Sequence, residues 1–553
     1  MMEFNQDGTG QRFIPGMAVV VAMILSDIRL MVYAQDDDTP PLLLLIVVYA
    51  LAWLTIYLLL TSIHRVTRVA AEIVLFSAIY TDLVYLLMSA FPFSFPDAIN
   101  ITNNPGYAPG AISSFGLIFL AAFLPAGFCF ILIKRTLTVL PKIRAGWVVP
   151  VNLVVVIAAL LSLGMFDFFP APYRVPGSLI AAAAATPEDR WERGAVAVPK
   201  KQTGIRDVVL IIDESISGGL LSINGYPLPT TKFLHNNSNA YTNFGIAGSY
   251  TNFSAGSNLA LISGLQQKHL PDNGFTAFKR PSVYQFAKNA GYSTHLLDAQ
   301  TVTGQLHNYT TNADFDYIDY LYQPQVNNPD LPVYDRDAIL GNRLIELIND
   351  DEPSFIVINK AGAHWPYKLS YPPWYQPEQF NNDDAPSTHY LRAVSWSVDR
   401  FWNNVLPAFD KEDLNALVIY TADHGENHDA GLYQMRHASI YNATSQEGQV
   451  PLLLIDRAGF LPNDFVPYRD GYAHAQIFPT ILQAMGYGKS YIISEYGESL
   501  IDTPPEQDRW FLTGDIFGRG KNFCQPVLDN KTEAGSAKSL AASTLVPATP
   551  EVE

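Results

Sequence analysis

The 553-residue sequence has few cysteines and few basic residues. It contains only two cysteines, Cys129 within an apolar stretch and Cys524 near the C-terminus, so an intramolecular disulfide between them is not expected. This scarcity does not fix the compartment, because an exported domain can lack disulfides. Lysine and arginine total 35 against 52 aspartates and glutamates, a formal net charge of −17. Since binding to nucleic-acid phosphates requires a basic face, this balance argues against a nucleic-acid partner.

Hydrophobic residues make up 48% of the chain, which is high for a soluble protein and indicates a membrane portion. The first 170 residues contain about five apolar stretches of the length that crosses a bilayer. The first stretch includes Asp27 and Arg29, charges that are costly at membrane depth; the alternatives for it are an interfacial segment or a poorly hydrophobic signal anchor. The five predicted spans are Ile14–Ala34, Pro41–Thr61, Ala71–Phe91, Ala111–Ile133 and Val148–Phe168.

The loops between these spans alternate in charge. Residues 35–38 are acidic, whereas residues 64–68, 134–135 and 142–144 are basic. Because basic loops stay in the cytoplasm, this pattern places the N-terminus inside, and an odd number of spans places the chain after Phe168 outside. We therefore expect a multi-pass protein of the inner membrane with a periplasmic or other extracytoplasmic domain.

The remainder of the chain divides by composition. A proline-containing connector over residues 169–205 precedes a region, 206–524, where apolar strand-like and amphipathic helix-like segments alternate, and residues 525–553 form a tail predicted to be disordered. This alternation predicts an α/β domain with a mostly parallel sheet and helices on both faces. The predicted strands are Val208–Ile212, Thr294–Leu297, Phe355–Asn359, Ala416–Tyr420 and Pro451–Ile455. The predicted helices are Ser282–Ala290, Asp335–Asp350, Tyr390–Ala408 and His474–Met485.

Two predicted strands end in side chains that ligate metals. Asp423 and His424 follow an apolar run, and Gly425 would let the backbone turn there. The run 207–213 is followed by Glu214. Because the carboxyl ends of parallel strands share one edge of a sheet, we expect these carboxylates and the imidazole to meet, as zinc would require. Alone, the Asp-His pair could equally be a helix cap beside a surface histidine.

Glu214, the segment 224–231 (Asn-Gly-Tyr-Pro-Leu-Pro-Thr-Thr) and the run Asp423–Glu426 together resemble the signature of phosphoethanolamine transferases that modify lipid A and related glycans. Those enzymes belong to the alkaline phosphatase and sulfatase superfamily. The resemblance implies five membrane spans followed by an exported catalytic domain. It further implies one or two Zn²⁺ ions, a phospholipid donor such as phosphatidylethanolamine, and a lipid A or glycan acceptor. Glu214, Asp423 and His424 match the family's metal ligands.

The resemblance places the nucleophile in the polar stretch 248–257, where the family's threonine aligns with Ser254, which would also ligate the metal. The stretch leads into a helix predicted to start at Asn258, and a hydroxyl near a helix N-terminus faces free N–H groups that suit a phosphate. A nearby metal would lower the hydroxyl's pKa, as it does for water. Thr251 and Ser257 remain alternatives, and Ser254 could also be merely a helix cap.

Three further histidines match family positions and are expected to bind substrate or a second metal ion: His364, His437 and His474. Each lies in a loop next to a predicted element. Since only neutral imidazole binds a metal, activity should fall as the pH drops through the imidazole range.

The sequence also departs from the lipid A enzymes. Their disulfide across the nucleophile loop would join Tyr250 and Ala260, and a donor-site lysine of some members is replaced near Thr303 and Gly304. Phosphoglycerol transfer or phosphodiester hydrolysis therefore stay open, as does a non-catalytic metal-binding scaffold for the envelope. The sulfatase Cys/Ser-x-Pro-x-Arg signature is absent from the nucleophile stretch, so sulfate-ester hydrolysis is not expected.

Overall fold

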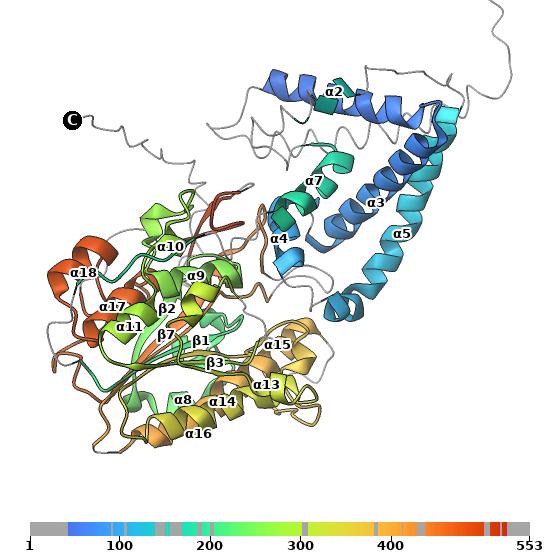
Figure 1. Ribbon diagram of the computed structural model, residues 1–553. Coiled ribbons are helices and arrows are strands. Elements are labelled where there is room, and N and C mark those ends of the chain that lie inside the picture. Colours follow the sequence, from blue (N-terminus) through green and yellow to red (C-terminus); the bar gives the residue numbers. More distant parts are fainter. Residues whose placement is uncertain are drawn as a thin grey trace, which may run out of the picture. The chain divides into compact units, whose positions relative to one another are not determined.

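A computed structural model gives the structure of the chain as two compact units, each described here by itself (Figure 1). One unit comprises residues 1–77, 127–173 and 528–553, and the other comprises residues 78–126 and 174–527. The structure describes residues 42–89, 92–103, 108–138, 150–151, 153–154, 157, 169–184, 191–198, 204–300, 308–380, 385–411, 413–428, 437–502, 509–519 and 522–527.

The N-terminal third is helical where it is described. Two of its helices are long and apolar enough to cross a membrane, over Arg65–Met88 and Phe115–Arg135, and a shorter apolar helix covers Tyr49–Leu60. Large apolar side chains on the longer helices are exposed, as the lipid-facing residues of a span would be. These helices coincide with three of the five predicted spans. The first predicted span and nearly all of the fifth fall outside the described residues, so the number five stays a prediction. The helices are α2 (Leu42–Leu60), α3 (Arg65–Ser89), α4 (Phe95–Asn103), α5 (Ala108–Thr138) and α7 (Ala171–Ala184).

The larger unit is built on a seven-stranded sheet in the order β2-β7-β6-β1-β5-β3-β4. Strand β7 runs antiparallel to both of its neighbours, and the other adjacent pairs are parallel. The mostly parallel sheet predicted from the sequence is thus confirmed. A separate antiparallel pair is formed by β8 and β9. The strands are β1 (Asp207–Asp213), β2 (Thr242–Gly248), β3 (Ser293–Asp298), β4 (Tyr320–Tyr322), β5 (Ser354–Asn359), β6 (Ala416–Ala422), β7 (Gln449–Asp456), β8 (Trp510–Leu512) and β9 (Cys524–Pro526).

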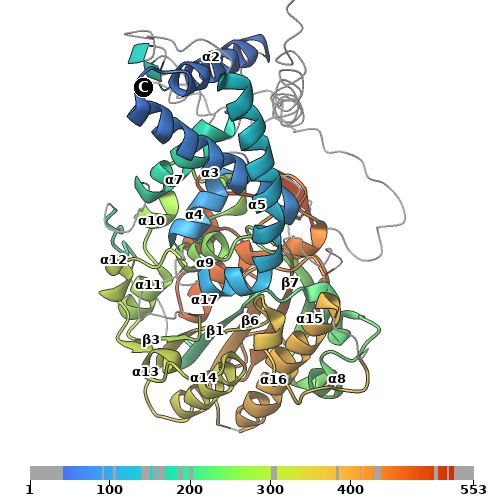
Figure 2. The same ribbon diagram turned by 90° about the vertical axis from the view of Figure 1, so that its right-hand side faces the viewer.

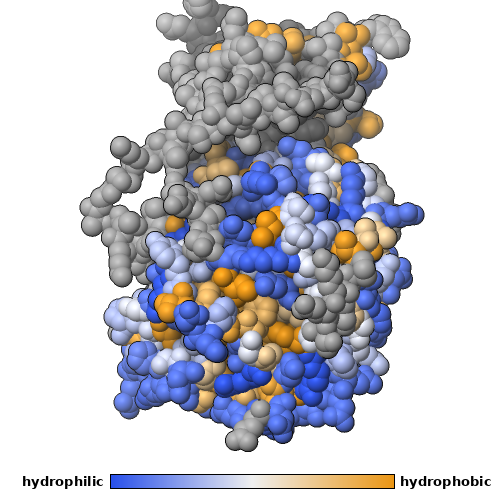
Figure 3. Space-filling view, turned by 90° about the vertical axis from the view of Figure 1, so that its left-hand side faces the viewer, coloured by the Kyte–Doolittle hydropathy of each residue, from blue (hydrophilic) through white to orange (hydrophobic). Residues whose placement is uncertain are grey.

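The central strands have the continuous apolar composition of a sheet covered on both faces, and every residue of β1 and β6 is buried. In Figures 1 and 2, helices α8, α14 and α16 lie on one face, and α9, α11 and α17 on the other. The side of this unit seen in Figure 3 is mostly hydrophilic, with scattered hydrophobic residues. The helices are α8 (Lys232–Asn236), α9 (Ser254–Ser263), α10 (Thr276–Lys279), α11 (Val283–Asn289), α12 (Asn312–Phe315), α13 (Pro324–Asn327), α14 (Val333–Leu347), α15 (Pro386–Val394), α16 (Arg400–Val405), α17 (Ile477–Ala484) and α18 (Lys489–Tyr496).

All five predicted strands are present within one or two residues, as β1, β3, β5, β6 and β7. The predicted helices correspond to α11, α14, α15 with α16, and α17; a π-helical turn, Ser395–Asp399, separates α15 from α16. The predicted disordered tail lies almost wholly outside the described residues. Because β2, β6, β1 and β5 run in the same direction, their carboxyl ends meet at one edge of the sheet, where α/β folds bind ligands.

Candidate metal and nucleophile site

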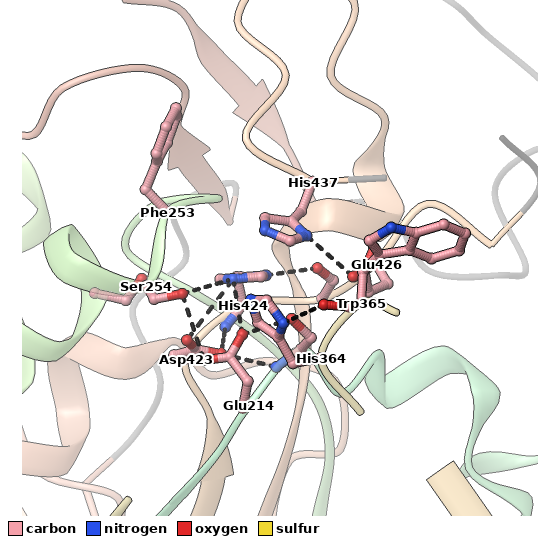
Figure 4. A network of polar contacts seen from close by, with 12 residues as sticks. Glu214, Phe253, Ser254, His364, Trp365, Asp423, His424, Glu426 and His437 are labelled. Atoms are coloured by element: carbon pink, nitrogen blue, oxygen red, sulfur yellow. Dashed lines mark hydrogen bonds and ion pairs between the residues drawn. The ribbon is translucent and has the colours of Figure 1, made fainter. Parts of the chain in front are cut away.

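Three of the predicted site residues meet at this edge as one cluster (Figure 4). Ligand atoms of Glu214, Asp423 and His424 all lie within 4.8 Å of one another, and all three side chains are buried. The first directly follows β1, and the other two directly follow β6. Adjacent parallel strands therefore bring together residues that are some two hundred positions apart in sequence, as the strand pattern predicted.

Ser254 completes the cluster from the other side. Its Oγ lies 3.1 Å from Nε2 of His424 and donates to Oε2 of Glu214 at 3.5 Å. Helix α9 begins at Ser254 itself, four residues before the predicted start at Asn258, so the hydroxyl sits in the first helical turn. Ser254 is partly exposed there. The backbone N–H groups in the first turn of a helix have no intrahelical partner and suit a phosphate.

The other two nucleophile candidates do not reach the cluster. The hydroxyl of Thr251 donates to the carbonyl of Phe253 at 2.7 Å. The hydroxyl of Ser257 accepts from the Thr251 N–H and donates to the Thr251 carbonyl, both at 3.1 Å. These side chains hold the turn together, which leaves Ser254 as the hydroxyl of this stretch directed at the metal-type ligands.

The polar atoms of the cluster present lone pairs that suit a cation. His424 donates from Nδ1 to the Gly425 carbonyl at 2.8 Å, so its Nε2 carries a lone pair. Oδ1 of Asp423 accepts from the backbone N–H groups of Ser215 and His424, at 3.0 and 2.8 Å. Oδ2 of Asp423 is buried and has no hydrogen-bond partner. An orphaned carboxylate oxygen beside an imidazole lone pair is the donor set expected for a metal ion.

Electrostatics point the same way. Burial, and then the negative charge of Asp423, raise the pKa of Glu214 well above its ordinary value. Two buried carboxylates cannot both stay ionised at this separation without a compensating cation. The residues present thus fit a divalent metal ion, and the imidazole favours zinc over magnesium or calcium, which prefer oxygen ligands.

The turn after β1 is held in place by close backbone packing against the loop after β5. The Ala363 N–H donates to the carbonyl of Glu214 at 3.0 Å. Gly362 has a φ of +59°, and a Cβ there would lie 2.3 Å from that carbonyl oxygen. Glycine is therefore required for the approach of the loop that carries His364.

A buried ion pair lies beneath the metal ligands. Asp213, the last residue of β1, pairs with the ammonium of Lys360, and both side chains are fully buried. The ammonium also donates to the carbonyl and hydroxyl of Ser397 at 3.0 Å, and Tyr420 donates to Asp213 at 2.9 Å. Although the strand pattern placed Asp213 at the same edge as Glu214, its carboxylate is committed to this pair and is not part of the metal-type cluster.

Two of the three additional histidines lie beside the cluster. The rings of His424 and His437 are 4.4 Å apart, and those of His437 and His364 are 6.2 Å apart, measured between centroids. Burial and the neighbouring His437 lower the pKa of His364 to about 4, so it is neutral at pH 7. Burial alone would lower the pKa of His437, but nearby carboxylates, Glu426 foremost, raise it above the ordinary value.

Glu426 is a site residue that the sequence analysis quoted within the motif without giving it a role. Its Oε1 pairs with Nδ1 of His437 at 3.0 Å, and its Oε2 is buried without a hydrogen-bond partner. Its position two residues after His424 was the available signal. His474, in contrast, has both of its ring nitrogens engaged by protein groups, the Tyr250 N–H and the Thr421 hydroxyl.

Glu447 joins three loops of the site and was missed from the sequence. Its carboxylate accepts from Asn252 Nδ2 at 2.7 Å and from the Ser439 N–H at 3.2 Å, while its carbonyl accepts from the Gly425 N–H at 2.9 Å. The residue follows neither of the two strand ends used for the prediction. The available signal was the capping-box sequence Thr444–Glu447, which the structure forms.

Glu447 should make stability depend on pH. Burial raises its pKa to about 7 in the folded chain, above the value of about 4.5 for an exposed glutamate. The folded protein therefore binds the proton more tightly, so this stabilisation is complete below pH 4.5 and is lost as the pH rises through 7. The loss amounts to about 3 kcal/mol. We expect the Tm of the wild type, measured with chelator present, to fall between pH 5 and 8 relative to that of Glu447→Gln. Parallel curves for the two proteins would contradict this assignment.

Comparisons with known proteins agree with the fold. The sulfatase family model matches residues 206–487, which is about half of the chain and contains every residue of the cluster. Phosphoethanolamine transferase EptC of Escherichia coli K12 is 26% identical over 276 residues, 45% of this chain and 44% of that protein. Phosphoethanolamine transferase CptA of Salmonella typhimurium is 24% identical over 266 residues, with the same coverage. The chain thus matches less than half the length of these curated relatives.

A solved structure extends the likeness in fold. The integral membrane lipooligosaccharide phosphoethanolamine transferase A of Neisseria meningitidis superposes with a TM-score of 0.56 at 19% identity, covering 78% of this chain and 87% of that one. These matches confirm the resemblance to phosphoethanolamine transferases inferred from the sequence. With the family model matching half of its length, the chain belongs to the sulfatase family.

Proposed function

We propose that the chain is a membrane-bound, zinc-dependent transferase that moves phosphoethanolamine from a phospholipid to a surface glycan or lipid A through a covalent intermediate on Ser254. The observation that carries this proposal is the placement of the Ser254 hydroxyl at a helix N-terminus, 3.1 Å from His424 Nε2 and within hydrogen-bonding reach of Glu214. A hydroxyl within hydrogen-bonding reach of a base and beside metal-type ligands has the setting of an activated nucleophile.

Glu214, Asp423, His424 and Ser254 would hold the zinc ion. Zinc bound there supplies charge that lowers the pKa of the serine hydroxyl and offsets the negative charge of the phosphate. The Glu426 oxygen without a hydrogen-bond partner, together with His364 and His437, would bind either a second metal ion or the substrate phosphate. One ion at the first four residues is sufficient for the chemistry proposed.

The reaction consists of two displacements at phosphorus. In the first, the Ser254 hydroxyl gives up its proton and Oγ bonds to the phosphorus of the donor lipid, while the bond to the diacylglycerol oxygen breaks and that oxygen takes up a proton. In the second, an acceptor oxygen loses its proton and attacks the same phosphorus, the serine ester breaks, Oγ regains a proton, and phosphoethanolamine is left on the acceptor. The free N–H groups at the start of α9 point to where the phosphate oxygens would lie.

The two histidines beside the cluster suit complementary tasks. His437, whose pKa is raised by nearby carboxylates despite its burial, can donate a proton to the departing diacylglycerol oxygen. His364 is kept neutral by burial and donates from Nδ1 to the Trp365 carbonyl, so the lone pair of the neutral ring is on Nε2, the atom type that accepts a hydrogen bond. His474 is assigned no contact with substrate.

A lipid donor explains why such a domain would be tethered. The apolar helices over Arg65–Met88 and Phe115–Arg135 support anchoring, and the five-span arrangement would place the catalytic domain on the outer side of the cytoplasmic membrane. The curated relatives are named phosphoethanolamine transferases, which favours phosphatidylethanolamine as donor. The relative from Neisseria is named for lipooligosaccharide, which favours a lipid A or glycan acceptor.

The donor can be identified directly with the full chain in detergent. We expect fluorescent phosphatidylethanolamine to lose its headgroup, fluorescent phosphatidylglycerol to remain intact, and chelator to stop the reaction. Loss from phosphatidylglycerol alone would instead make the chain a phosphoglycerol transferase. Tight zinc binding without turnover of either lipid would favour a scaffold. Mass spectrometry of cell-surface glycans then separates transfer, which adds phosphoethanolamine, from hydrolysis, which leaves the glycans unchanged.

A further inference from the structure

His474 is a buried histidine placed between the nucleophile turn and a metal-ligand strand. It opens the short 3₁₀ turn His474–Gln476 that precedes α17, and its side chain is 1% exposed. The backbone N–H of Tyr250 donates to its Nδ1 at 3.3 Å. Its Nε2 lies 3.1 Å from the hydroxyl oxygen of Thr421. The ring therefore connects two segments that come from opposite sides of the site.

These two contacts fix the tautomer. Because a backbone N–H can only donate, Nδ1 must be the acceptor, and in the neutral ring the proton then sits on Nε2 and is donated to Thr421. Burial lowers the pKa of His474 to about 4, outweighing a hydrogen bond to the backbone of Ala422 and the nearby carboxylate of Asp423, in keeping with a neutral ring. A ring with both nitrogens engaged by protein has no atom left for substrate or metal.

The two connected segments carry the nucleophile and two of the metal-type ligands, so the distance between the segments sets the distance between these groups. Thr421 lies in β6, two residues before Asp423. Tyr250 begins the turn whose hydrogen bonds through Thr251 lead directly into Ser254. Backbone hydrogen bonds hold the turn to other segments: the Leu512 N–H donates to the Tyr250 carbonyl at 2.9 Å, and the Ala438 N–H donates to the Asn252 carbonyl at 3.1 Å. The imidazole is the contact that connects the turn to β6.

We infer that His474 is a positioning residue that fastens the nucleophile turn to β6 and so sets the distance between the Ser254 hydroxyl and the metal ligands. This assignment rests on the proposed function for its consequence in catalysis. A displacement of about 1 Å at a reacting atom can cost about a hundredfold in rate. Loss of the clamp should therefore lower kcat while leaving the affinity for the donor lipid nearly unchanged.

The chain offers a matched control. His295 is also buried, and its Nε2 lies 3.1 Å from the hydroxyl of Ser293. It lies near the amino-terminal ends of β3 and β5, at the opposite edge of the sheet from the site. Replacing either histidine by phenylalanine removes a ring with hydrogen bonds from the interior, but only one replacement should alter the nucleophile turn.

The test compares His474→Phe, His474→Asn, His474→Gln and His295→Phe in the full chain. We expect His474→Phe to lower kcat for headgroup release about 10- to 100-fold, with KM within about threefold and zinc content unchanged. Amide hydrogen exchange in the peptide containing Tyr250 should speed up. His474→Asn, which restores an acceptor for the Tyr250 N–H, should recover protection and part of kcat. His474→Gln, which reaches only toward Thr421, should recover neither the protection nor kcat. His295→Phe should change neither kcat nor the exchange rate at Tyr250.

Unchanged exchange at Tyr250 in a folded His474→Phe protein would overturn the clamp. Faster exchange with unchanged kcat would overturn its role in positioning the nucleophile. If His474→Phe does not fold, the Asn and Gln variants decide, since only the former should protect Tyr250. A wild type that releases no headgroup would refute the proposed function, whereas the exchange measurements would still accept or reject the clamp.

Discussion

Replacing Ser254 by alanine is expected to abolish headgroup release and the covalent adduct together. Oγ of Ser254 lies within 3.5 Å of both Glu214 and His424, whereas the hydroxyls of Thr251 and Ser257 are held within the turn and are not placed to take over the attack. Removing a nucleophile of this kind lowers kcat by about a thousandfold or more. The measurement is headgroup release from fluorescent phosphatidylethanolamine, with mass spectrometry of the digested protein for phosphoethanolamine on the peptide containing residue 254.

Three variants on or next to the same helix make this test specific. Ser263→Ala removes a buried hydroxyl at the far end of α9, which donates to the Ala260 carbonyl at 3.5 Å, and should leave the rate unchanged. Ser257→Ala should loosen the turn but keep the adduct on residue 254. Ser254→Thr keeps a hydroxyl in place and should retain part of the activity. Full activity in Ser254→Ala, or an adduct on Thr251 or Ser257, would show that the nucleophile has been misassigned.

The metal-type cluster could be predicted from the sequence because its two segments are simple. β1 and β6 are continuous apolar runs with polar residues directly after them, and the physics of parallel sheets brings such ends to one edge. No knowledge of strand order was needed, since any arrangement with both strands parallel and near each other gives the same result. In the structure the two strands are immediate neighbours, in register from Asp207 to Asp213.

The nucleophile segment was harder to predict for equally physical reasons. β2, the strand that leads to it, contains glycines and an asparagine and is interrupted by an irregularity between Asn243 and Gly245. Such a sequence lacks the apolar run that marks a buried strand, so β2 was not predicted. Helix α9 was expected to start at Asn258 because Ala255 and Gly256 give no amphipathic signal, although the helix already begins at Ser254.

The contacts that support the site depend on tertiary structure and leave no trace in local sequence. Lys360 is paired with Asp213 across two strands, and Glu447 connects loops from three parts of the chain. The expectation that His474 binds substrate came from resemblance alone. The structure instead gives both ring nitrogens to protein groups, a fact that only the packing of Tyr250 and Thr421 could reveal.

Replacing Asp423 by asparagine is expected to remove the zinc ion and the activity while preserving the fold. The amide oxygen of asparagine can take over the role of Oδ1, which accepts from the Ser215 and His424 N–H groups. The amide nitrogen would then replace the orphaned Oδ2 and present N–H donors to the cation. We expect zinc content, measured by mass spectrometry of the purified full chain, to fall from about one ion per chain to near zero. Headgroup release should fall at least about a hundredfold with it.

Asp298→Asn is the matched control, because Asp298 is also a buried carboxylate at the carboxyl end of a strand, β3, but bonds to Gln300 and Gln323. It should keep both zinc and activity.

Chelator should reproduce the Asp423→Asn result in the wild type, and added zinc should restore the wild type alone, because the variant lacks the oxygen that binds the ion. Without the cation, burial and the charge of Asp423 raise the pKa of Glu214, so zinc binding to the wild type should release a proton at pH values above the ordinary glutamate range. One zinc ion per chain and near-normal activity in Asp423→Asn would remove Asp423 from the ligand set.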